Sequence, residues 1–393
     1  MNAFSAWKTV YVLFLLLVGL KWDGQTALAQ TSSDDDPSSV LTEQEWTTVN
    51  RAVGRALEWM ISNQNPDGSF PTHITGQPGV TSLCLLAFLS QGHIPGEGKY
   101  GKHLQAALDS IISTQKRNGL LTFVGPNGRN ITRKVDHQIG YTLVYNHAIA
   151  GLVLSESYAM VGSATTKEIE PVIRQALDAT LEMQGFVKDR KRDEGGWRYL
   201  DDVDGVDSDL SVTGWQLMFM RSAKNAGFDV EEKPIQEAID YVQRCFLNDR
   251  GTFTYKVDFH NRPSRGMAGA GILALAHSGL HDTPEAKRAG DWILKSGFHQ
   301  YNQQGRVRDI VARGDRYHYG LLTCSQAMYQ LGGRHWREFF PAMSRELIAN
   351  QHSNGSWQPE SMHNDKIYGN VYTTALGVIA LSSSNQLLPI FQR

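Results

Sequence analysis

The sequence predicts an all-α fold, an α/α toroid in which six helical hairpins form a barrel of inner and outer helices. Two observations carry this prediction. A two-helix unit recurs six times along the 393 residues, and the two helices of each unit differ in character. The first helix is amphipathic, whereas the second is apolar on nearly every side and rich in Gly, Ala, Thr and Leu. An amphipathic helix faces water on one side, and a helix that is apolar all round is buried all round. Units of this kind stack because none buries its apolar face alone.

The N-terminal segment predicts export. Lys8 precedes an apolar run from Val10 to Leu20, and Ala27-Leu28-Ala29 has the small-x-small pattern of a leader cleavage site. The run is shorter than the about 20 residues of a membrane-spanning helix. We therefore expect a signal peptide over residues 1–29 and no span after its cleavage; an uncleaved anchor is the alternative. Residues 30–46 are polar and acidic, which predicts a disordered linker.

The repeats fill residues 47–393 in order. The first helices are expected to begin near Thr47, Gly101, Ile169, Ile235, Pro284 and Arg337, and the second helices near Val80, Tyr145, Asp209, Gly266, Tyr319 and Val371. Connections from a first to a second helix are long, as in residues 119–144 and 185–208, whereas the return connections are short. Because every pair runs the same way round, all long loops gather at one end of the barrel, which is where we expect a functional site.

A turn motif follows several of the first helices. The first copy has Arg55-Ala56, Trp59-Met60, Gln64 and Gly68-Ser69-Phe70, and the last has Gln351 and Gly355-Ser356-Trp357. Gln184 and Gly196-Trp197 give a third copy with an insertion, and other copies carry Leu121 or Phe253 in place of Trp.

This pattern resembles the QW motif of squalene and hopene cyclases, the prenyltransferase/squalene oxidase repeat. The resemblance covers residues 47–388 and implies the α/α toroid that terpenoid cyclases share with protein prenyltransferase β-subunits. A shared fold hosts many functions, so it implies no particular reaction.

An acidic stretch precedes the third inner helix. Class II terpene cyclases carry a D-x-D-D sequence at such a place, where a central carboxylic acid protonates an alkene. Asp207-Ser208-Asp209 is similar to its first part, but Leu210 stands at the fourth position. The resemblance therefore implies Asp209 as the proton donor, with Asp207 as its neighbour. The alternative is that Asp209 or Ser211 caps the helix and that the other acids form a solvated loop or a cation-binding turn.

Aromatic and polar residues recur around the same end of the barrel, and they form the expected ligand-binding rim. Pockets for small molecules are lined by apolar and aromatic side chains with a few polar groups. Aromatic faces would also stabilise a carbocation. The alternative is that these residues pack the wide loops and cap the inner helices. The rim residues are Tyr145, Asn146, His147, Trp215, Arg265, His318, Tyr319, Tyr368 and Tyr372.

Several functional classes are disfavoured by the sequence. The cysteines Cys84, Cys245 and Cys324 lie far apart in helical patterns, which predicts buried free thiols rather than disulfides or zinc ligands. We expect no metal site and no cofactor. A formal net charge of −2 predicts no nucleic-acid partner.

The function expected from the sequence is the binding of an isoprenoid- or lipid-like ligand in a central cavity by an exported toroid. The most specific version of this hypothesis is class II cyclase-like acid catalysis at Asp209. Whether the protein is an enzyme stays open. One alternative is a non-catalytic scaffold or binding module of the cell envelope. Another is a toroidal carbohydrate-active enzyme with a glycan ligand. Membrane contact is compatible with each of them, and protein partners are left open.

Overall fold

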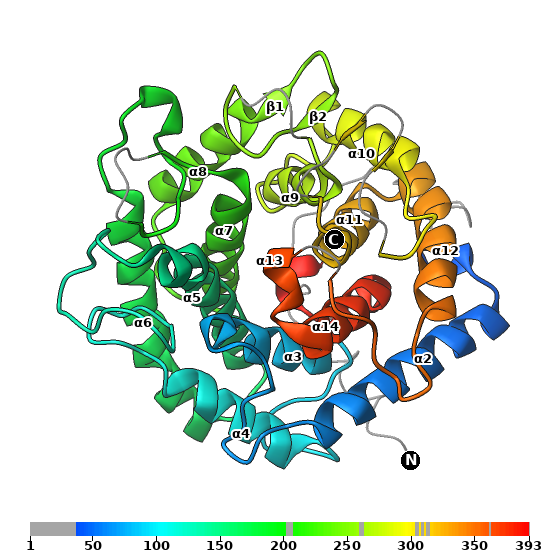
Figure 1. Ribbon diagram of the computed structural model, residues 1–393, viewed down its shortest axis with the longest axis horizontal. Helices are drawn as coiled ribbons and strands as arrows, with labels where there is room; N and C mark the ends of the chain where they lie inside the picture. The colour runs from blue at the N-terminus through cyan, green and yellow to red at the C-terminus, as the bar shows by residue number, and fades with distance from the viewer. Residues whose placement is uncertain are drawn as a thin grey trace, which may run out of the picture. The chain divides into compact units, whose positions relative to one another are not determined.

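The computed structural model describes residues 37–201, 207–258, 263–302, 306–307, 310–311, 315–360 and 363–392. In these residues the helices form two concentric rings (Figure 1). The outer ring consists of α2 (Glu43–Ser62), α4 (Gly101–Ile112), α6 (Ser163–Gln184), α8 (Glu232–Arg244), α10 (Pro284–Ser296) and α12 (Gly333–Ala349). The inner ring consists of α3 (Gly79–Leu89), α5 (His137–Tyr158), α7 (Leu210–Asn225), α9 (Arg265–Ala276), α11 (Tyr317–Leu331) and α14 (Gly369–Leu381). The all-α toroid predicted from the sequence is confirmed.

Short elements occupy the connections. They are the 3₁₀ helices η3 (Pro37–Val40), η4 (Ile74–Gly76), η5 (Lys191–Asp193), η6 (Ser383–Asn385) and η7 (Pro389–Phe391), and the one-turn helix α13 (His363–Lys366). Strands β1 (Phe246–Leu247) and β2 (Thr252–Phe253) pair antiparallel, as do β3 (Arg306–Val307) and β4 (Ile310–Val311). In the part of the chain that the structure describes, no helix is long and apolar enough to cross a membrane.

Burial differs between the rings as the sequence pattern predicts. Every residue of α3 is buried, and so is every residue of α9 except Ala276. In α8, by contrast, buried residues recur on one face only, at Ile235, Ala238, Ile239 and Val242, with Tyr241 beside them. The inner ring therefore forms the core, and the outer ring separates it from water.

The space between the rings is filled by the aromatic side chains of the turn motif. Phe70, Trp197, Phe253 and Trp357 are fully buried. Within the inner ring, Gly269 of α9 allows close contact with α11. A Cβ atom at Gly269 would lie 2.6 Å from the carbonyl carbon of Thr323. Small residues therefore set the distance between these two helices.

The glutamine of the turn motif joins neighbouring repeats. Gln64, Gln115, Gln184 and Gln351 each donate their side-chain amide to the carbonyl of a glycine in their own turn and to a carbonyl of the next outer helix. The acceptors on the next helix are His103, Val172, Pro234 and Ala52, at 2.8 to 2.9 Å. Because Ala52 belongs to α2, the last of these links joins the end of the repeat array to its beginning.

Several helices begin earlier than the sequence predicts, because caps lie outside the apolar pattern. Helix α5 begins at His137 rather than near Tyr145, since the Asp136 side chain accepts the backbone N–H of Gln138. Helix α2 begins at Glu43, where Thr42 and Glu45 form a capping box. The prediction of a disordered linker was therefore wrong for residues 43–46, which are helical. Residues 1–36, with the predicted signal peptide, lie outside the described residues.

The two ends of the barrel differ. The long loops lie at the N-terminal ends of the inner helices, as predicted. At the opposite end, η7 packs against the last turns of the inner helices, and Leu388, Ile390 and Phe391 are buried there. The Gln330 amide of α11 donates to the Phe391 carbonyl at 2.7 Å. The C-terminal segment therefore covers the end of the barrel away from the long loops.

Candidate functional site

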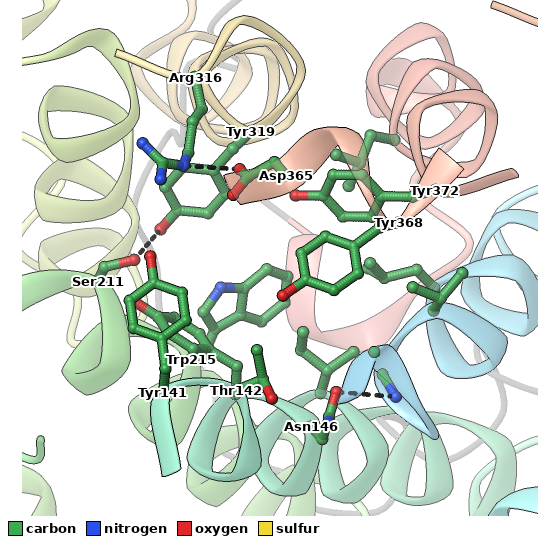
Figure 2. A pocket seen from close by; sticks show the side chains of 17 residues that line it. Tyr141, Thr142, Asn146, Ser211, Trp215, Arg316, Tyr319, Asp365, Tyr368 and Tyr372 are labelled. Atoms are coloured by element: carbon green, nitrogen blue, oxygen red, sulfur yellow. Dashed lines mark hydrogen bonds and ion pairs between the residues drawn. The ribbon is translucent and has the colours of Figure 1, made fainter. Parts of the chain in front are cut away.

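A cavity of about 120 Å³ lies inside the inner ring at the end where the long loops gather. It is lined by side chains from α3, α5, α7, α11 and α14, together with Gly76 of η4 and Asp365 of α13. Figure 2 shows these side chains converging from the surrounding helices. The position of the cavity agrees with the prediction that a site lies at this end.

Six aromatic side chains form most of the wall. They come in neighbouring pairs, with ring centroids 6.4 Å apart for Tyr141 and Tyr145, 6.4 Å for Trp215 and Tyr319, and 5.7 Å for Tyr368 and Tyr372. Of these residues, the sequence predicted all but Tyr141. Apolar side chains complete the wall, namely Val80, Leu83, Ile149 and Leu376.

Two tyrosine hydroxyl groups on this wall have no hydrogen-bond partner among the described residues, those of Tyr145 and Tyr372. Both side chains are partly buried, and burial raises the pKa of each well above its ordinary value. Both hydroxyls therefore stay neutral at physiological pH. A tyrosine hydroxyl both donates and accepts, so these two groups are available to a ligand or to water.

The charged part of the wall is an ion pair. Arg316, which precedes α11, donates to Asp365 of α13 at 2.6 Å, and both side chains are largely buried (Figure 2). Burial raises the pKa of the Asp365 carboxyl, and the Arg316 guanidinium opposes this shift. On the same side of the cavity, the Ser211 hydroxyl donates to the Tyr319 hydroxyl at 3.2 Å.

Asn146 lines the cavity, but its side chain is occupied by the protein. Its carbonyl oxygen accepts the Gly79 N–H at 3.3 Å, and its amide donates to the Thr75 carbonyl at 2.8 Å. Asn146 thus holds η4 and the start of α3 against α5. It shapes the cavity instead of offering free polar atoms to a ligand.

Asp209 is not part of the cavity wall. One carboxylate oxygen accepts the Val212 N–H at 2.8 Å and caps α7, and the other accepts from Arg198 at 2.7 Å. Burial raises the pKa of Asp209, while Arg198 and the Val212 N–H oppose the shift. Asp207 pairs with Arg198 at 3.1 Å and with Lys256. This geometry supports the alternative of a helix cap and does not support Asp209 as a proton donor to a ligand in the cavity.

Three further residues of the expected rim lie outside the cavity wall. His147 is fully buried between the Leu121 N–H at 3.1 Å and the Thr180 hydroxyl at 2.9 Å, and burial lowers its pKa to about 3. Its imidazole therefore stays neutral and holds the second turn motif. The rim prediction did not foresee this, because residue type alone does not tell which side of α5 faces the cavity.

Arg265 and His318 are also held by protein partners. The Arg265 guanidinium pairs with Asp315 at 2.6 Å, and the His318 ring lies 2.9 Å from Glu360. Burial opposes ionisation of Glu360, but its hydrogen bonds from His318 hold the pKa of this carboxyl below the ordinary value. Both pairs fix the start of an inner helix to a neighbouring loop. Arg265 and His318 therefore stabilise the fold and do not line the cavity.

Three residues of the cavity wall were not predicted from the sequence, namely Tyr141, Arg316 and Asp365. Tyr141 lies four residues before Tyr145 on α5, so the helical period places both on one face. This signal was lost because α5 was expected to begin only near Tyr145. Arg316 lies in a loop and Asp365 in the one-turn helix α13, and their pairing depends on the way two repeats meet.

No protein-family model matches the sequence, and no curated protein is similar to it by sequence. Solved structures are similar in fold. A type II terpene cyclase, MstE from Scytonema, in complex with merosterolic acid A is 15% identical, with a TM-score of 0.56 over 88% of this chain and 100% of that chain. A D-mannose isomerase is 12% identical, with a TM-score of 0.60 over 87% of this chain and 98% of the other.

A variant of an α-1,6-mannanase from Salegentibacter sp. HEL1_6 in complex with α-1,6-mannotriose is 13% identical, with a TM-score of 0.59 over 86% of this chain and 99% of the other. The resemblance to terpenoid cyclase toroids is thus borne out at the level of the fold. At these identities the likeness concerns the fold alone, because proteins with this fold act on both terpenoids and sugars.

Proposed function

We propose that this protein is an exported toroid whose cavity binds a neutral, ring-sized ligand that carries hydroxyl groups, the chemistry of a sugar unit. The observation that carries the proposal is the wall itself. Aromatic rings surround a small space, and among them Tyr145 and Tyr372 have hydroxyl groups without a partner in the described residues. Aromatic faces accept the C–H face of a sugar ring, and tyrosine hydroxyls both donate to and accept from its hydroxyl groups.

The charge of the wall favours a neutral ligand. Arg316 and Asp365 are the charged residues in the described lining, and they neutralise each other at 2.6 Å. A phosphate or diphosphate would have to compete with Asp365 for the guanidinium, and an ammonium group would face Arg316. A hydroxyl group of a ligand, by contrast, could donate to the carboxylate or accept from the guanidinium while the two charges stay together.

The size of the cavity limits the ligand to one ring. An apolar cavity of about 150 Å³ holds benzene, and pockets for drug-sized ligands measure roughly 300 to 1,000 Å³. The volume of about 120 Å³ therefore accommodates a terminal ring, with the rest of the ligand in the loops. An isoprenoid end group is the second candidate, because Val80, Leu83, Ile149 and Leu376 give the cavity an apolar side.

We propose binding in place of catalysis. Glycoside hydrolysis uses two carboxyl groups that flank the bond, whereas Asp365 is the one carboxylate in the described lining. Acid catalysis on an alkene would need a protonated carboxylic acid that faces the ligand. Asp365 lines the cavity, but it is paired with the Arg316 guanidinium at 2.6 Å. Asp209 has both oxygens engaged by protein groups.

The test is calorimetric titration of the protein with mannose, glucose, galactose and N-acetylglucosamine, and in parallel with farnesol and geranylgeraniol. Tyr372→Phe should weaken sugar binding by about 5-fold, the effect of one lost hydrogen bond. Tyr158→Phe, at the far end of α5, is the matched control and should leave binding unchanged. Binding of the isoprenols alone would transfer the proposal to the second candidate, and binding of neither class would refute it. Intact mass of the secreted protein tests cleavage after Ala29.

A further inference from the structure

Two neighbouring segments of the long loops at the cavity end of the barrel carry more basic than acidic residues. Residues 116–134 contain five Lys or Arg residues and no Asp or Glu, in a chain whose net charge is −2. Residues 186–192 add four basic residues and the single acid Asp189. The net charge of the chain does not reveal these two basic stretches, because acidic residues elsewhere balance them.

The fold brings the two stretches together at the end of α6. The Ile131 N–H donates to Glu182 on the last turn of α6, at 3.1 Å, and the second stretch leaves that same turn. Burial and the nearby Arg133 together lower the pKa of Lys188 to about 8. The second segment lies between α6 and α8, where the Arg244 guanidinium donates to the Arg192 carbonyl at 3.1 Å. We call residues 116–134 and 186–192 the basic surface.

Exposed apolar side chains lie within the same surface. Phe123 is 53% exposed and Val187 is 87% exposed, one on each loop. Within the described part of the chain, Arg117, Arg129 and Lys134 form no ion pair with a carboxylate, and all three are exposed. The Phe123 N–H donates to the Gln77 carbonyl at 3.2 Å, two residues before the cavity residue Gly79. The surface therefore adjoins the rim of the cavity.

We propose that the basic surface docks the protein on an anionic lipid bilayer. Lys and Arg side chains near an anionic bilayer are attracted to its phospholipid headgroups, and exposed aromatic and aliphatic side chains enter the headgroup boundary. A soluble polyanion would satisfy the cations but would leave Phe123 and Val187 in water, which favours the bilayer. Docking through this face would place the cavity rim at the membrane surface, and it holds whether the cavity binds a sugar or another ligand.

The experiment is co-sedimentation of the exported protein with vesicles of phosphatidylcholine, with and without 30% phosphatidylglycerol, at about 50 and 300 mM salt. Intact mass is recorded so that any remaining leader is the same in every variant. The surface variant combines Arg117→Gln, Arg129→Gln and Lys134→Gln. The matched control combines Lys102→Gln, Lys167→Gln and Lys224→Gln, which removes the same charge from exposed positions at the opposite end of the barrel.

We expect binding to the anionic vesicles only, weakened by salt and reduced up to about 100-fold in the surface variant, about 5-fold for each of its three cations. The control should bind like the unaltered protein. Phe123→Ser should weaken vesicle binding with little effect on binding to a soluble polyanion such as dextran sulfate. Equal binding by surface variant and control would overturn the proposal, and so would binding to dextran sulfate with no affinity for vesicles. Thermal unfolding of each variant checks that the fold is intact.

Discussion

Gln351 joins the last repeat to the first. Its side-chain amide donates to the carbonyl of Ala52, 299 positions earlier in the sequence, and to the carbonyl of Gly355 in its own turn, both at 2.8 Å. The same bridge occurs between neighbouring repeats at Gln64, Gln115 and Gln184. A feature that is local in three repeats thus also closes the ring.

Replacing Gln351 by Ala should lower the free energy of unfolding by about 1 to 3 kcal/mol, because two carbonyl groups lose their donor. Urea unfolding followed by circular dichroism measures this. Gln175→Ala is the matched control, since Gln175 is an exposed glutamine on the outer helix α6, and it should change stability by less than about 0.5 kcal/mol. A Gln351 variant as stable as this control would mean that the bridge does not hold the ring closed.

The inner ring should tolerate a methyl group at one glycine and not at another. Gly269→Ala places a Cβ atom 2.6 Å from backbone of α11 and should destabilise the protein by about 1 to 3 kcal/mol. At Gly214 of α7 the nearest atom would be 3.7 Å away, so Gly214→Ala should be neutral or stabilising by up to about 1 kcal/mol. Thermal unfolding of both variants gives the comparison, and equal effects would argue against close packing between α9 and α11.

Stability should fall as the pH rises through the titration of Glu156. This carboxyl is buried at the end of α5, where it accepts from Ser222 and, at 3.5 Å, from the Ile390 N–H of the C-terminal segment. Burial raises its pKa from 4.5 to about 7. The folded state therefore holds the proton more tightly than the unfolded state, and stability is lost between pH 4.5 and about 7, on the order of 3 kcal/mol.

The difference in unfolding free energy between the unaltered protein and Glu156→Gln isolates this contribution. It should decline over that pH window and stay constant above about pH 7. The exposed Glu168→Gln on α6 controls for the loss of one charge. A difference that is independent of pH would show that Glu156 does not titrate in this range.

The ion pair of the cavity should matter more to stability than a surface pair. Asp365→Asn removes the carboxylate that faces the largely buried Arg316 guanidinium and should cost about 3 kcal/mol. The double variant with Arg316→Gln should cost less than the sum of the two single changes. Asp282→Asn, which breaks the exposed pair with Lys287, should have little effect. Additive effects in the cavity pair would contradict a direct interaction.

The repeat pattern predicted the rings, their order and the end that carries the cavity, because helical amphipathicity and loop length are local properties. It also predicted most of the aromatic wall. The pattern did not show which residues of an inner helix face the cavity and which face the outer ring. Tyr145 faces the cavity, whereas His147, two residues later, faces the second turn motif. The start of α5 was predicted about two turns too late, because its N-cap, Asp136, lies in a polar loop.

The sequence by itself determined which helices are buried, how they succeed one another and where the long loops gather. Only the tertiary structure decided which polar groups meet. Asp209 is held by Arg198 and caps α7, while Asp365, from the one-turn helix α13, lies at the cavity beside Arg316. The reason is physical. Burial of an apolar face depends on spacing along one segment, whereas the partner of a buried charge depends on which segments the closed ring brings within about 3 Å of each other.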